Sequence, residues 1–522
     1  MRNRFFLPLL FILSSLILSA CGGGSSSTST TTYTIGGTIS GLTSGSVVLQ
    51  NNGGDALTIS ANSTTFTFAT GLANSATYAV TVGTQPSGLT CSASNSTGTV
   101  ASTNVTNVAI SCAPSWTGTK QLGVAGKMTS GFSVATDASG NVYVAGYTTG
   151  GLDGNTSTGT FDFFVTKYNS SGIKQYTKQL GVARITDGNS VATDASGNVY
   201  VAGSTSGGLD GNTSTGTFDF FVTKYNSSGV KQYTKQLGVA GAATLGNSVA
   251  TDASGNVYVA GSTSGGLDGN TLTGTSDFFV TKYNSSGVKQ YTKQLGVAGQ
   301  VTDGLSVAID TNGNVYIAGY TGGRLDGNTL TGTTDFFVTK YDASGVKQYT
   351  KQLGVAGQTT AGRSVTTDTN GNVYIAGYTY GGLDGNTLTG TLDFFVTKYN
   401  SSGVKQYTKQ LGVTDKYTYG NSVATDTNGN VYIAGYTYGG LDGNTLTGNY
   451  DFFVTKYSSS GVKQYTKQLG VAGQDTDGNS VATDASGNVY VAGYTRGGLD
   501  GNTLTGTYDF FVTKYSSSGV KQ

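Results

Sequence analysis

Aspartate supplies every acidic side chain of this 522-residue sequence, because the sequence contains no Glu. Three aspartates recur at fixed places in each of seven copies of one segment, and in the first copy they are Asp137, Asp153 and Asp162. Carboxylate and amide oxygens are the ligands that Ca²⁺ prefers. Two carboxylates held in unlike environments can instead act as the acid and the base of a glycoside hydrolase. The pattern therefore raises two chemistries, metal binding and hydrolysis.

A calcium site would draw its oxygen ligands from Leu383-Asp384-Gly385-Asn386 and from Asp393 in the fifth copy. The spacing departs from that of an EF-hand loop, because Leu388 stands where a ligand is needed and Gly390 falls one place late. Asp, Asn and Gly also favour turns, in which side chains hydrogen-bond their own backbone. We expect structural turns, no metal ligand and no cofactor, with calcium as the alternative.

Catalysis is disfavoured by the residue types that are missing. The sequence has no His and no Glu, on which acid/base and metal chemistry most often depend. Seven equivalent aspartate triplets also offer seven similar environments, whereas a hydrolase needs one pair with separated acidities. We predict that the protein is not an enzyme. A carbohydrate-active hydrolase with paired Asp, made asymmetric by residues that differ between copies, is the alternative.

The elements that position these residues belong to a repeat of about fifty-eight residues, marked by Gln-Leu-Gly at Gln121 and six further positions. In the first copy we expect strands at Ser133–Thr136, Val142–Tyr147, Phe163–Tyr168 and through Gln175–Lys178. Four antiparallel strands per copy predict an all-β fold, a seven-bladed β-propeller of four-stranded blades. A stacked β-solenoid is the alternative.

The two ends of the repeat block predict how the ring closes. The last copy stops at Val520-Lys521-Gln522, before the Tyr-Thr-Lys of its siblings, whereas Trp116–Leu122 precedes the first copy. We expect Trp116–Leu122 to complete the last blade, with Trp116 taking the aromatic role of Tyr176 in a shifted register. A truncated last blade would instead expose an unpaired sheet edge.

Two segments of the first copy carry a family resemblance. Gly140–Thr148 followed by Asp162–Asn169 resembles the bacterial seven-bladed β-propeller repeat (SBBP) family. The motif recurs in every copy, and the resemblance covers roughly Trp116 to Gln522. It implies an exported propeller and does not imply a reaction, so function has to be argued from sites.

Residues that differ between copies are the candidates for binding. In an up-and-down blade, the loop between the second and third strands emerges on the same face as the loop to the next blade. Here both loops vary, and tyrosines gather in the later copies beside an arginine, a composition typical of recognition surfaces. We predict that the ligand contacts are Tyr378, Tyr380, Tyr417, Tyr419, Tyr436, Tyr438 and Arg496. The alternative is drift in exposed loops, with the rings only packing on neighbouring blades.

The first twenty residues have the layout of a secretory signal, with Arg2 and Arg4 before an apolar run from Phe5 to Leu18. Leu18-Ser19-Ala20-Cys21 resembles the lipobox of bacterial lipoproteins, which implies cleavage and acylation of Cys21, as with palmitate. By the same resemblance, Gly22 after the Cys implies sorting to the outer membrane. An ordinary signal peptide with an incidental Cys is the alternative. Residues 21–32 would then form a flexible Gly/Ser/Thr tether.

Residues 33–113 show short alternating apolar runs separated by Gly, Asn and Ser, which predict a small antiparallel β-sandwich of immunoglobulin-like type. The segment resembles a small all-β domain found behind the lipid anchor of bacterial surface proteins, which implies a spacer. Once Cys21 is acylated, Cys91 and Cys112 form an even pair in an exported protein, so we expect a disulfide. Two buried free thiols are the alternative.

Charge excludes some partners. Loss of the signal removes two of the 29 basic residues and leaves 27 against 28 acidic ones, so no basic field favours nucleic acid or an anionic membrane surface. With residues 114–522 as the propeller, we predict a monomeric, lipid-anchored outer-membrane protein, periplasmic or surface-exposed. It would be a non-catalytic scaffold that binds a protein or glycan. A purely structural envelope component is a further alternative.

Overall fold

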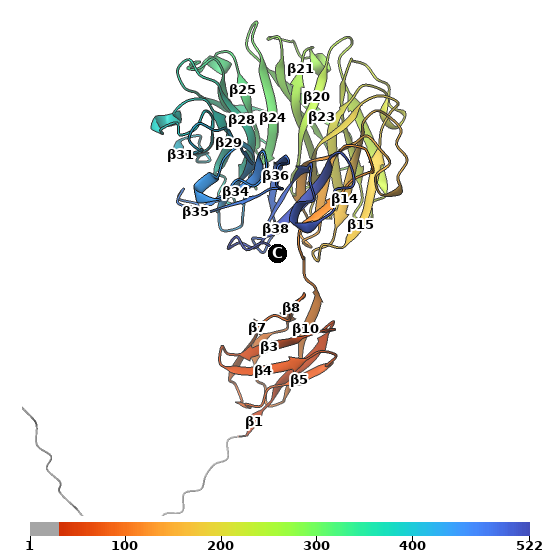
Figure 1. The fold of residues 1–522 in the computed structure, drawn as a ribbon, viewed down its shortest axis with the longest axis vertical. Coiled ribbons are helices and arrows are strands. Elements are labelled where there is room, and N and C mark those ends of the chain that lie inside the picture. Colours follow the sequence, from red (N-terminus) through yellow and green to blue (C-terminus); the bar gives the residue numbers. More distant parts are fainter. Residues whose placement is uncertain (1–30) are drawn as a thin grey trace, which may run out of the picture. The chain divides into compact units, whose positions relative to one another are not determined.

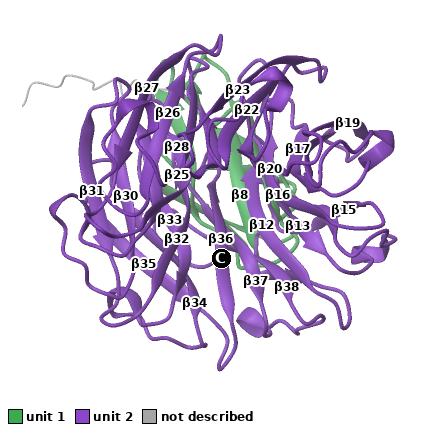
Figure 2. Ribbon diagram, turned by 90° about the horizontal axis from the view of Figure 1, so that it is seen from above, with its two compact units in different colours: residues 1–113 green, residues 114–522 purple. Residues whose placement is uncertain are grey.

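The computed structural model describes residues 31–522, so the expected signal peptide and Cys21 lie outside the described residues. The regular secondary structure of residues 31–522 consists of strands and single turns of 3-10 helix, without an α-helix. Within that range no helix has the length and hydropathy needed to span a membrane. The chain divides into two compact units, residues 1–113 and residues 114–522, coloured separately in Figure 2.

Unit 1 is built from short strands (Figure 1). They are β1 (Thr32–Tyr33), β2 (Ile35–Ser40), β3 (Ser46–Asn51), β4 (Asp55–Ser60), β5 (Thr65–Thr67), β6 (Leu72–Ala73), β7 (Thr77–Thr84), β8 (Leu89–Ser94), β9 (Thr97–Thr99) and β10 (Val105–Pro114). Two four-stranded sheets, ordered β5-β2-β10-β8 and β4-β3-β7-β9, bury one common hydrophobic core, and β1 pairs with β6. Alternation within β3 places Val47 and Leu49 in that core.

One strand pair of unit 1 corrects the sequence-based expectation. β10 runs parallel to β2, with Val108 opposite Gly37 and Ile110 opposite Ile39, so the expectation of an entirely antiparallel sandwich is wrong at this pair. Alternating apolar residues specify which face of a strand is buried but not its direction. The same sheet holds Cys91 in β8 and Cys112 in β10, and the structure contains the disulfide between them.

Unit 2 repeats a four-stranded antiparallel blade (Figures 1 and 2). The first blade consists of β12 (Thr129–Thr136), β13 (Val142–Thr148), β14 (Asp162–Tyr168) and β15 (Lys174–Leu180). The next five are β16 (Thr186–Thr193), β17 (Val199–Thr205), β18 (Asp219–Tyr225), β19 (Lys231–Leu237); β20 (Thr244–Thr251), β21 (Val257–Thr263), β22 (Asp277–Tyr283), β23 (Lys289–Leu295); β24 (Thr302–Ile309), β25 (Val315–Thr321), β26 (Asp335–Tyr341), β27 (Lys347–Leu353); β28 (Thr360–Thr367), β29 (Val373–Thr379), β30 (Asp393–Tyr399), β31 (Lys405–Leu411); and β32 (Thr418–Thr425), β33 (Val431–Thr437), β34 (Asp451–Tyr457), β35 (Lys463–Leu469). The seventh is β36 (Thr476–Thr483), β37 (Val489–Thr495), β38 (Asp509–Tyr515) and β11 (Lys120–Leu122).

Each second strand is followed by one turn of 3-10 helix. These turns are η1 (Leu152–Gly154), η2 (Leu209–Gly211), η3 (Leu267–Gly269), η4 (Leu325–Gly327), η5 (Leu383–Gly385), η6 (Leu441–Gly443) and η7 (Leu499–Gly501). The leucine of each turn is fully buried, so the long loop is anchored to the core of its blade.

Neighbouring blades pack through stacked phenylalanine rings. Phe163 of β14 stacks on Phe221 of β18 with ring centroids 5.0 Å apart, and the same pair recurs from blade to blade. The series ends where Phe510 of the last blade stacks on Phe164 of the first, also at 5.0 Å. Because first and last blades make the same contact as sequential ones, unit 2 is a closed seven-bladed β-propeller.

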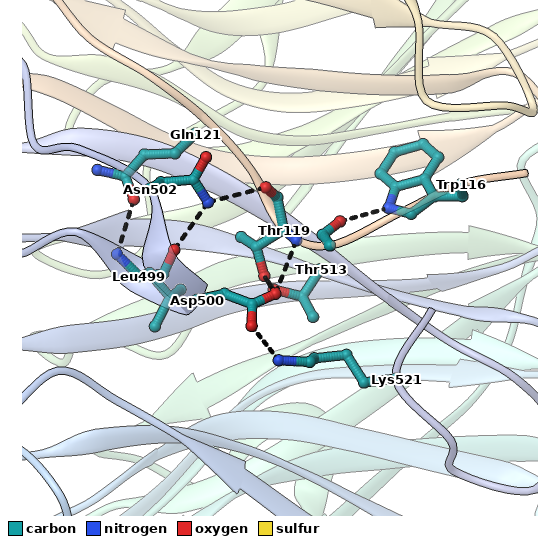
Figure 3. A network of polar contacts seen from close by, with 9 residues as sticks. Trp116, Thr119, Gln121, Leu499, Asp500, Asn502, Thr513 and Lys521 are labelled. Atoms are coloured by element: carbon teal, nitrogen blue, oxygen red, sulfur yellow. Dashed lines mark hydrogen bonds and ion pairs between the residues drawn. The ribbon is translucent and has the colours of Figure 1, made fainter. Parts of the chain in front are cut away.

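The closing strand comes from the N-terminal side of the repeats, as predicted. β11 pairs antiparallel with β38, and Leu122 lies opposite Phe510 as Leu180 lies opposite Phe163 in the first blade. Figure 3 shows the side-chain contacts of this closure. Gln121 Oε1 accepts a hydrogen bond from the backbone N–H of Leu499 at 3.0 Å, and the first blade has the same contact.

Trp116 takes the place of the tyrosine in the fourth strand of the other blades. It is buried against Tyr490 and Tyr168, with ring centroids 5.5 and 6.0 Å away, and its Nε1–H donates to the carbonyl of Gly118 at 2.9 Å. A Cβ on Gly172 would lie 3.0 Å from the Trp116 ring, just as a Cβ on the equivalent glycine of the next blade would meet Tyr176. Trp116 therefore takes the predicted aromatic role, but the expected register shift is confined to the ring's place in the sequence: Trp116 lies two residues further upstream than Tyr176 does, while β11 pairs with β38 in the same register as β15 with β14.

Candidate functional site

The first aspartate of each copy caps the turn between the first two strands. Asp137 Oδ1 accepts hydrogen bonds from the backbone N–H groups of Ser139 and Asn141, both at 2.9 Å. Its Oδ2 accepts from Asn141 Nδ2 at 2.7 Å and from the Tyr143 hydroxyl at 2.9 Å. The equivalent residues with the same contacts are Asp194, Asp252, Asp310, Asp368, Asp426 and Asp484.

The second aspartate lies in the 3-10 turn and has a left-handed backbone. Asp153 has φ of 55°, a conformation that Asp tolerates better than most residues. Its carboxylate pairs with Lys174 of β15, and this ion pair recurs in every blade. Both partners are about one-third exposed, so each pair contributes little to stability.

The third aspartate begins the third strand and is fully buried. Asp162 accepts hydrogen bonds from the backbone N–H groups of Thr158 at 2.6 Å and Gly159 at 2.9 Å, and from Gln179 Nε2 at 2.9 Å. These bonds fold the end of the long loop onto the fourth strand. A buried carboxylate with several N–H donors is a stable structural element.

These contacts support the turn interpretation of the aspartates over the calcium alternative. In the fifth copy Asp384 pairs with Lys405, Asn386 Nδ2 donates to the carbonyl of Leu383 at 2.7 Å, and Asp393 accepts from Gly390 at 2.8 Å. The proposed calcium ligands therefore make separate internal contacts. Across residues 31–522 no three acidic or Cys side chains are grouped so that they could hold a metal ion.

The variable loops lie together on one face of the propeller, as the blade topology predicts. Residues that precede a third strand form parallel bridges with residues that lead into the next blade, such as Phe161 with Ile185 and Tyr450 with Asp475. The long loop of one blade thus contacts the connection to its neighbour. Differences between copies at these positions change this face and leave the strands below unaltered.

Tyrosines of the fifth and sixth blades form one contiguous cluster on this face. We call it the tyrosine surface: Tyr378, Tyr380, Tyr417, Tyr419, Tyr436, Tyr438 and Tyr450. Tyr378 contacts Tyr419 across the boundary between these blades at 5.2 Å between ring centroids. Tyr419 stacks on Tyr436 at 4.8 Å, and Tyr436 contacts Tyr438 and Tyr450. The structure therefore brings the six predicted tyrosines together.

The cluster combines supporting rings with accessible ones. Tyr380, Tyr417 and Tyr438 are 36%, 40% and 36% exposed, whereas Tyr378 and Tyr436 are more deeply buried. Burial raises the pKa of the Tyr438 hydroxyl, with a smaller contribution from the nearby Asp475 carboxylate. A tyrosine hydroxyl can both donate and accept a hydrogen bond. The rings also pack on one another, as the alternative explanation expects, while Tyr380, Tyr417 and Tyr438 keep exposed surface.

Arg496 lies beside the tyrosine surface but already has partners. Its Nε lies 3.3 Å from Asp475 Oδ2, and its guanidinium lies 4.5 Å above the ring of Tyr508 while also donating to that residue's hydroxyl. The side chain is nevertheless 47% exposed. Its role as a ligand contact stays a prediction.

The predicted ligand contacts leave out Tyr450, Tyr494 and Tyr508, although Tyr494 belongs to the same variable loops. Tyr450 and Tyr508 directly precede third strands, and Tyr450 lies 3.4 Å from Tyr494 between hydroxyl oxygens. The sequence does contain a signal for them, because these positions vary between copies as the predicted ones do. For example, Ser276 occupies in the third copy the position that Tyr508 occupies in the seventh. Tyr450 extends the tyrosine surface towards the seventh blade.

One pair of aspartates in the seventh blade has unlike environments. Asp475 is paired with Arg496, whereas Asp477 is 8% exposed. Burial raises the pKa of Asp477 to about 7, against smaller lowering effects of Tyr494 and of the Arg363 guanidinium. This pair breaks the sevenfold equivalence of the aspartates. Neither residue was singled out from the sequence, because burial at this position depends on the tyrosines packed around it.

A model of the SBBP beta-propeller repeat matches the chain seven times. The matched segments are residues 118–153, 175–210, 232–268, 290–326, 348–384, 406–442 and 464–500. Among curated proteins, the regulatory protein FlaEY of Caulobacter vibrioides is 27% identical over 344 residues, which is 55% of this chain and 34% of that protein. The chain thus spans about one third of the length of this relative.

Solved structures with a similar arrangement include the WD40 propeller domain of Doa1 and the polysaccharide lyase Uly1. The Doa1 domain is 11% identical, covers 75% of this chain and 96% of its own, and has a TM-score of 0.39. Uly1 is 12% identical, covers 74% and 90%, and has a TM-score of 0.42. At these scores neither similarity bears on function.

Proposed function

Because the chain belongs to the SBBP beta-propeller repeat family, we propose that its propeller is a non-catalytic binding scaffold for a protein or glycan of the cell envelope. Propellers are generally interaction scaffolds, in which a rigid ring of blades holds variable loops on one face. Here those loops carry the residues that differ between otherwise similar copies. The ligand contacts are proposed on that face.

The tyrosine surface is the observation that carries this proposal. Tyr380, Tyr417 and Tyr438 present accessible rings, and each contacts a less exposed ring, namely Tyr378, Tyr419 and Tyr436 respectively. Tyrosine brings a large contact area and a hydrogen-bonding hydroxyl at low conformational entropy cost. Such rings can stack on the apolar face of a sugar or fill a pocket of a partner protein.

The test compares the full chain with a double variant, Tyr380→Ala and Tyr438→Ala, on a glycan array, in calcium and again in chelator. We expect selective binding that the double variant reduces at least about tenfold, with little change in melting temperature. Val346→Ala with Val404→Ala is the matched control. Both valines are more exposed than the two tyrosines, and they lie in the turns between the third and fourth strands, away from the face of the variable loops. A large loss of stability with unchanged binding would contradict the proposal.

A blank array would direct the search to pull-downs from envelope extracts with the same variants. A protein captured by the wild type and by the valine control, but not by the tyrosine variant, supports the scaffold with a protein ligand. Equal capture by all three contradicts a role for the tyrosine surface.

We also propose where the protein is located: it is anchored in the outer membrane by a lipid on Cys21. The support is the lipobox-like Leu18-Ser19-Ala20-Cys21 and the Gly22 that follows it. Labelled palmitate should enter the wild-type protein and not a Cys21→Ser variant, and only the wild type should fractionate with outer membranes. Labelling that persists in Cys21→Ser would rule out this anchor.

A hydrolase remains a second candidate because of Asp475 and Asp477. Burial raises the pKa of Asp477, and Asp475 is paired with Arg496, so the two carboxylates have the unlike environments that acid/base catalysis requires. The burial of Asp477 limits its access to substrate. A panel of chromogenic glycosides and polysaccharides tests this candidate, since turnover abolished by Asp477→Asn would replace the scaffold proposal with a catalytic one.

A further inference from the structure

The axis of the propeller has a polar cavity that the proposed function does not use. Each innermost strand has a β-bulge at its fourth residue, where the register with the second strand shifts. A bulge turns one extra side chain out of the strand pattern. The seven bulged residues surround a cavity of about 240 Å³ on the side of the variable loops.

Four of the seven bulged residues are asparagines with a fixed orientation. They are Asn189, Asn247, Asn421 and Asn479. Each Nδ2 donates to a glycine carbonyl of the next blade at 2.9 to 3.1 Å, so the amide nitrogen points between blades. The four Oδ1 atoms accept no hydrogen bond from residues 31–522. They are therefore available as acceptors for a ligand that carries donors.

Arg363 is the only charged member of this ring. Its neighbours in the ring are Leu305 of the fourth blade and Asn421 of the sixth, and Phe132 is the remaining apolar member. Within the described chain the guanidinium makes no ion pair and donates no hydrogen bond. Arg363 thus places an exposed guanidinium, with its planar set of N–H donors, at the wall of the cavity.

No nearby carboxylate of the described chain forms an ion pair with the Arg363 guanidinium. The charge of Arg363 lowers the pKa of Asp477 slightly, but Asp477 is buried and lies beyond ion-pair distance. Asp303 is engaged by hydrogen bonds from the Tyr320 hydroxyl at 2.8 Å and from the Ser276 hydroxyl at 2.7 Å. Arg363 is thus free to bind the carboxylate of a ligand.

We propose that this cavity binds one acidic sugar residue, with its carboxylate on Arg363 and its hydroxyls donating to the asparagine Oδ1 atoms. Arg pairs with carboxylates in bidentate geometry, which gives both affinity and orientation. A carboxylate from a protein side chain would satisfy Arg363 but would bring no donors for the asparagines. The inference does not rest on the tyrosine surface, because none of its residues lines the cavity.

Calorimetric titration of the full chain with methyl β-D-glucuronide, methyl β-D-glucoside and propionate tests this. The glucuronide should bind at least about tenfold more tightly than either of the others, since only it carries both the carboxylate and the hydroxyls. Arg363→Gln should lose that advantage. Arg363→Lys should keep part of it, because the charge stays while the bidentate geometry is lost.

Arg324→Gln is the matched control, since Arg324 precedes η4 on the same face, is exposed and does not line the cavity. Its affinity for the glucuronide should equal that of the wild type. No binding by the wild type, equal binding by Arg363→Gln, or propionate binding as tight as glucuronide would each overturn the proposal. The Tyr380→Ala and Tyr438→Ala variant should bind the glucuronide normally, so failure here and failure of the tyrosine surface are distinguishable.

Discussion

At the scale of single residues, equivalent side chains of near-identical copies differ in burial and hydrogen bonding, because the residues packed around them differ. Asp187, Asp303 and Asp477 occupy the same place in the second, fourth and seventh blades. Burial raises the pKa of Asp187 to about 6 and that of Asp477 to about 7, whereas Asp303 is held by two hydroxyl donors. The repeat therefore fixes the position of a side chain, and the loops around it fix its acidity.

Asp477→Asn should stabilise the protein in a pH-dependent way. The folded-state pKa of Asp477 lies above the ordinary 3.8, so the unfolded state ionises first and stability falls as pH rises from about 4 to about 7. Asn cannot ionise, so the variant does not lose this stability as the pH rises. The variant should match the wild type near pH 4 and exceed it by up to about 4 kcal/mol above pH 7, since each pKa unit is worth about 1.4 kcal/mol.

Thermal or denaturant unfolding at pH 4, 6 and 8 measures this difference. Asp187→Asn serves as the graded comparison, because its smaller shift should give a smaller gain that saturates about one pH unit lower. A gain for Asp477→Asn that does not vary with pH would show that folding does not raise the pKa of this carboxyl.

At the scale of elements, the closing strand β11 is the one fourth strand not continuous in sequence with its own blade. Its three residues hold the ring through pairing with β38 and through the side-chain contacts of Figure 3. Without it, β38 would present an open edge. Trp116 adds the aromatic contact that a tyrosine makes elsewhere.

Trp116→Ala should destabilise unit 2 by roughly 3–5 kcal/mol, the usual range for removing a buried large aromatic side chain. Tyr349→Ala, at the equivalent ring of the fourth blade, should cost less, because that strand is covalently continuous with its blade and Tyr349 is only partly buried. Far-UV circular dichroism during denaturant unfolding compares the two. Equal losses would mean that closure is no weaker than the other blades.

Trp116 is also the single tryptophan of the sequence, so its fluorescence reports on closure alone. In the wild type we expect emission typical of a buried indole. The emission should shift to the red at the same denaturant concentration as the circular dichroism signal changes, because the blades share one closed ring of contacts. An earlier fluorescence transition would show that the ring opens before the blades unfold.

At the scale of the whole molecule, the chain joins two units with different sources of stability. Unit 1 buries a small core and carries the Cys91–Cys112 disulfide, whereas unit 2 repeats one interface between blades around a ring. Small domains gain more from a cross-link than large ones do, because their cores are limited.

Reduction of the disulfide, or Cys91→Ala with Cys112→Ala, should destabilise unit 1 by about 3 kcal/mol, the value expected for a closed loop of this length. The Trp116 transition of unit 2 should not move. Calorimetry with and without reductant, read beside Trp116 fluorescence, measures both. A fall in the fluorescence midpoint upon reduction would show that the stabilities of the units are coupled.

The sequence by itself determined the seven blades, their strands and the origin of the closing strand. Alternating β-branched and aromatic residues between Asp/Asn/Gly turns are local signals, and their period repeats them seven times. The turn role of the aspartates was also readable, because Asp137 bonds residues two, four and six positions away. The candidate tyrosines were found because they break the repeat.

Only the tertiary structure decided which of these residues share an environment. Tyr378 and Tyr419 are 41 residues apart and come from different blades, and the bulged residues converge from all seven blades on one cavity. The parallel pairing of β10 with β2 likewise joins the two ends of unit 1. Contacts between distant segments, and the burial that raises the pKa of Asp477, depend on which side chains of different strands and loops meet in space, which no local pattern in the chain encodes.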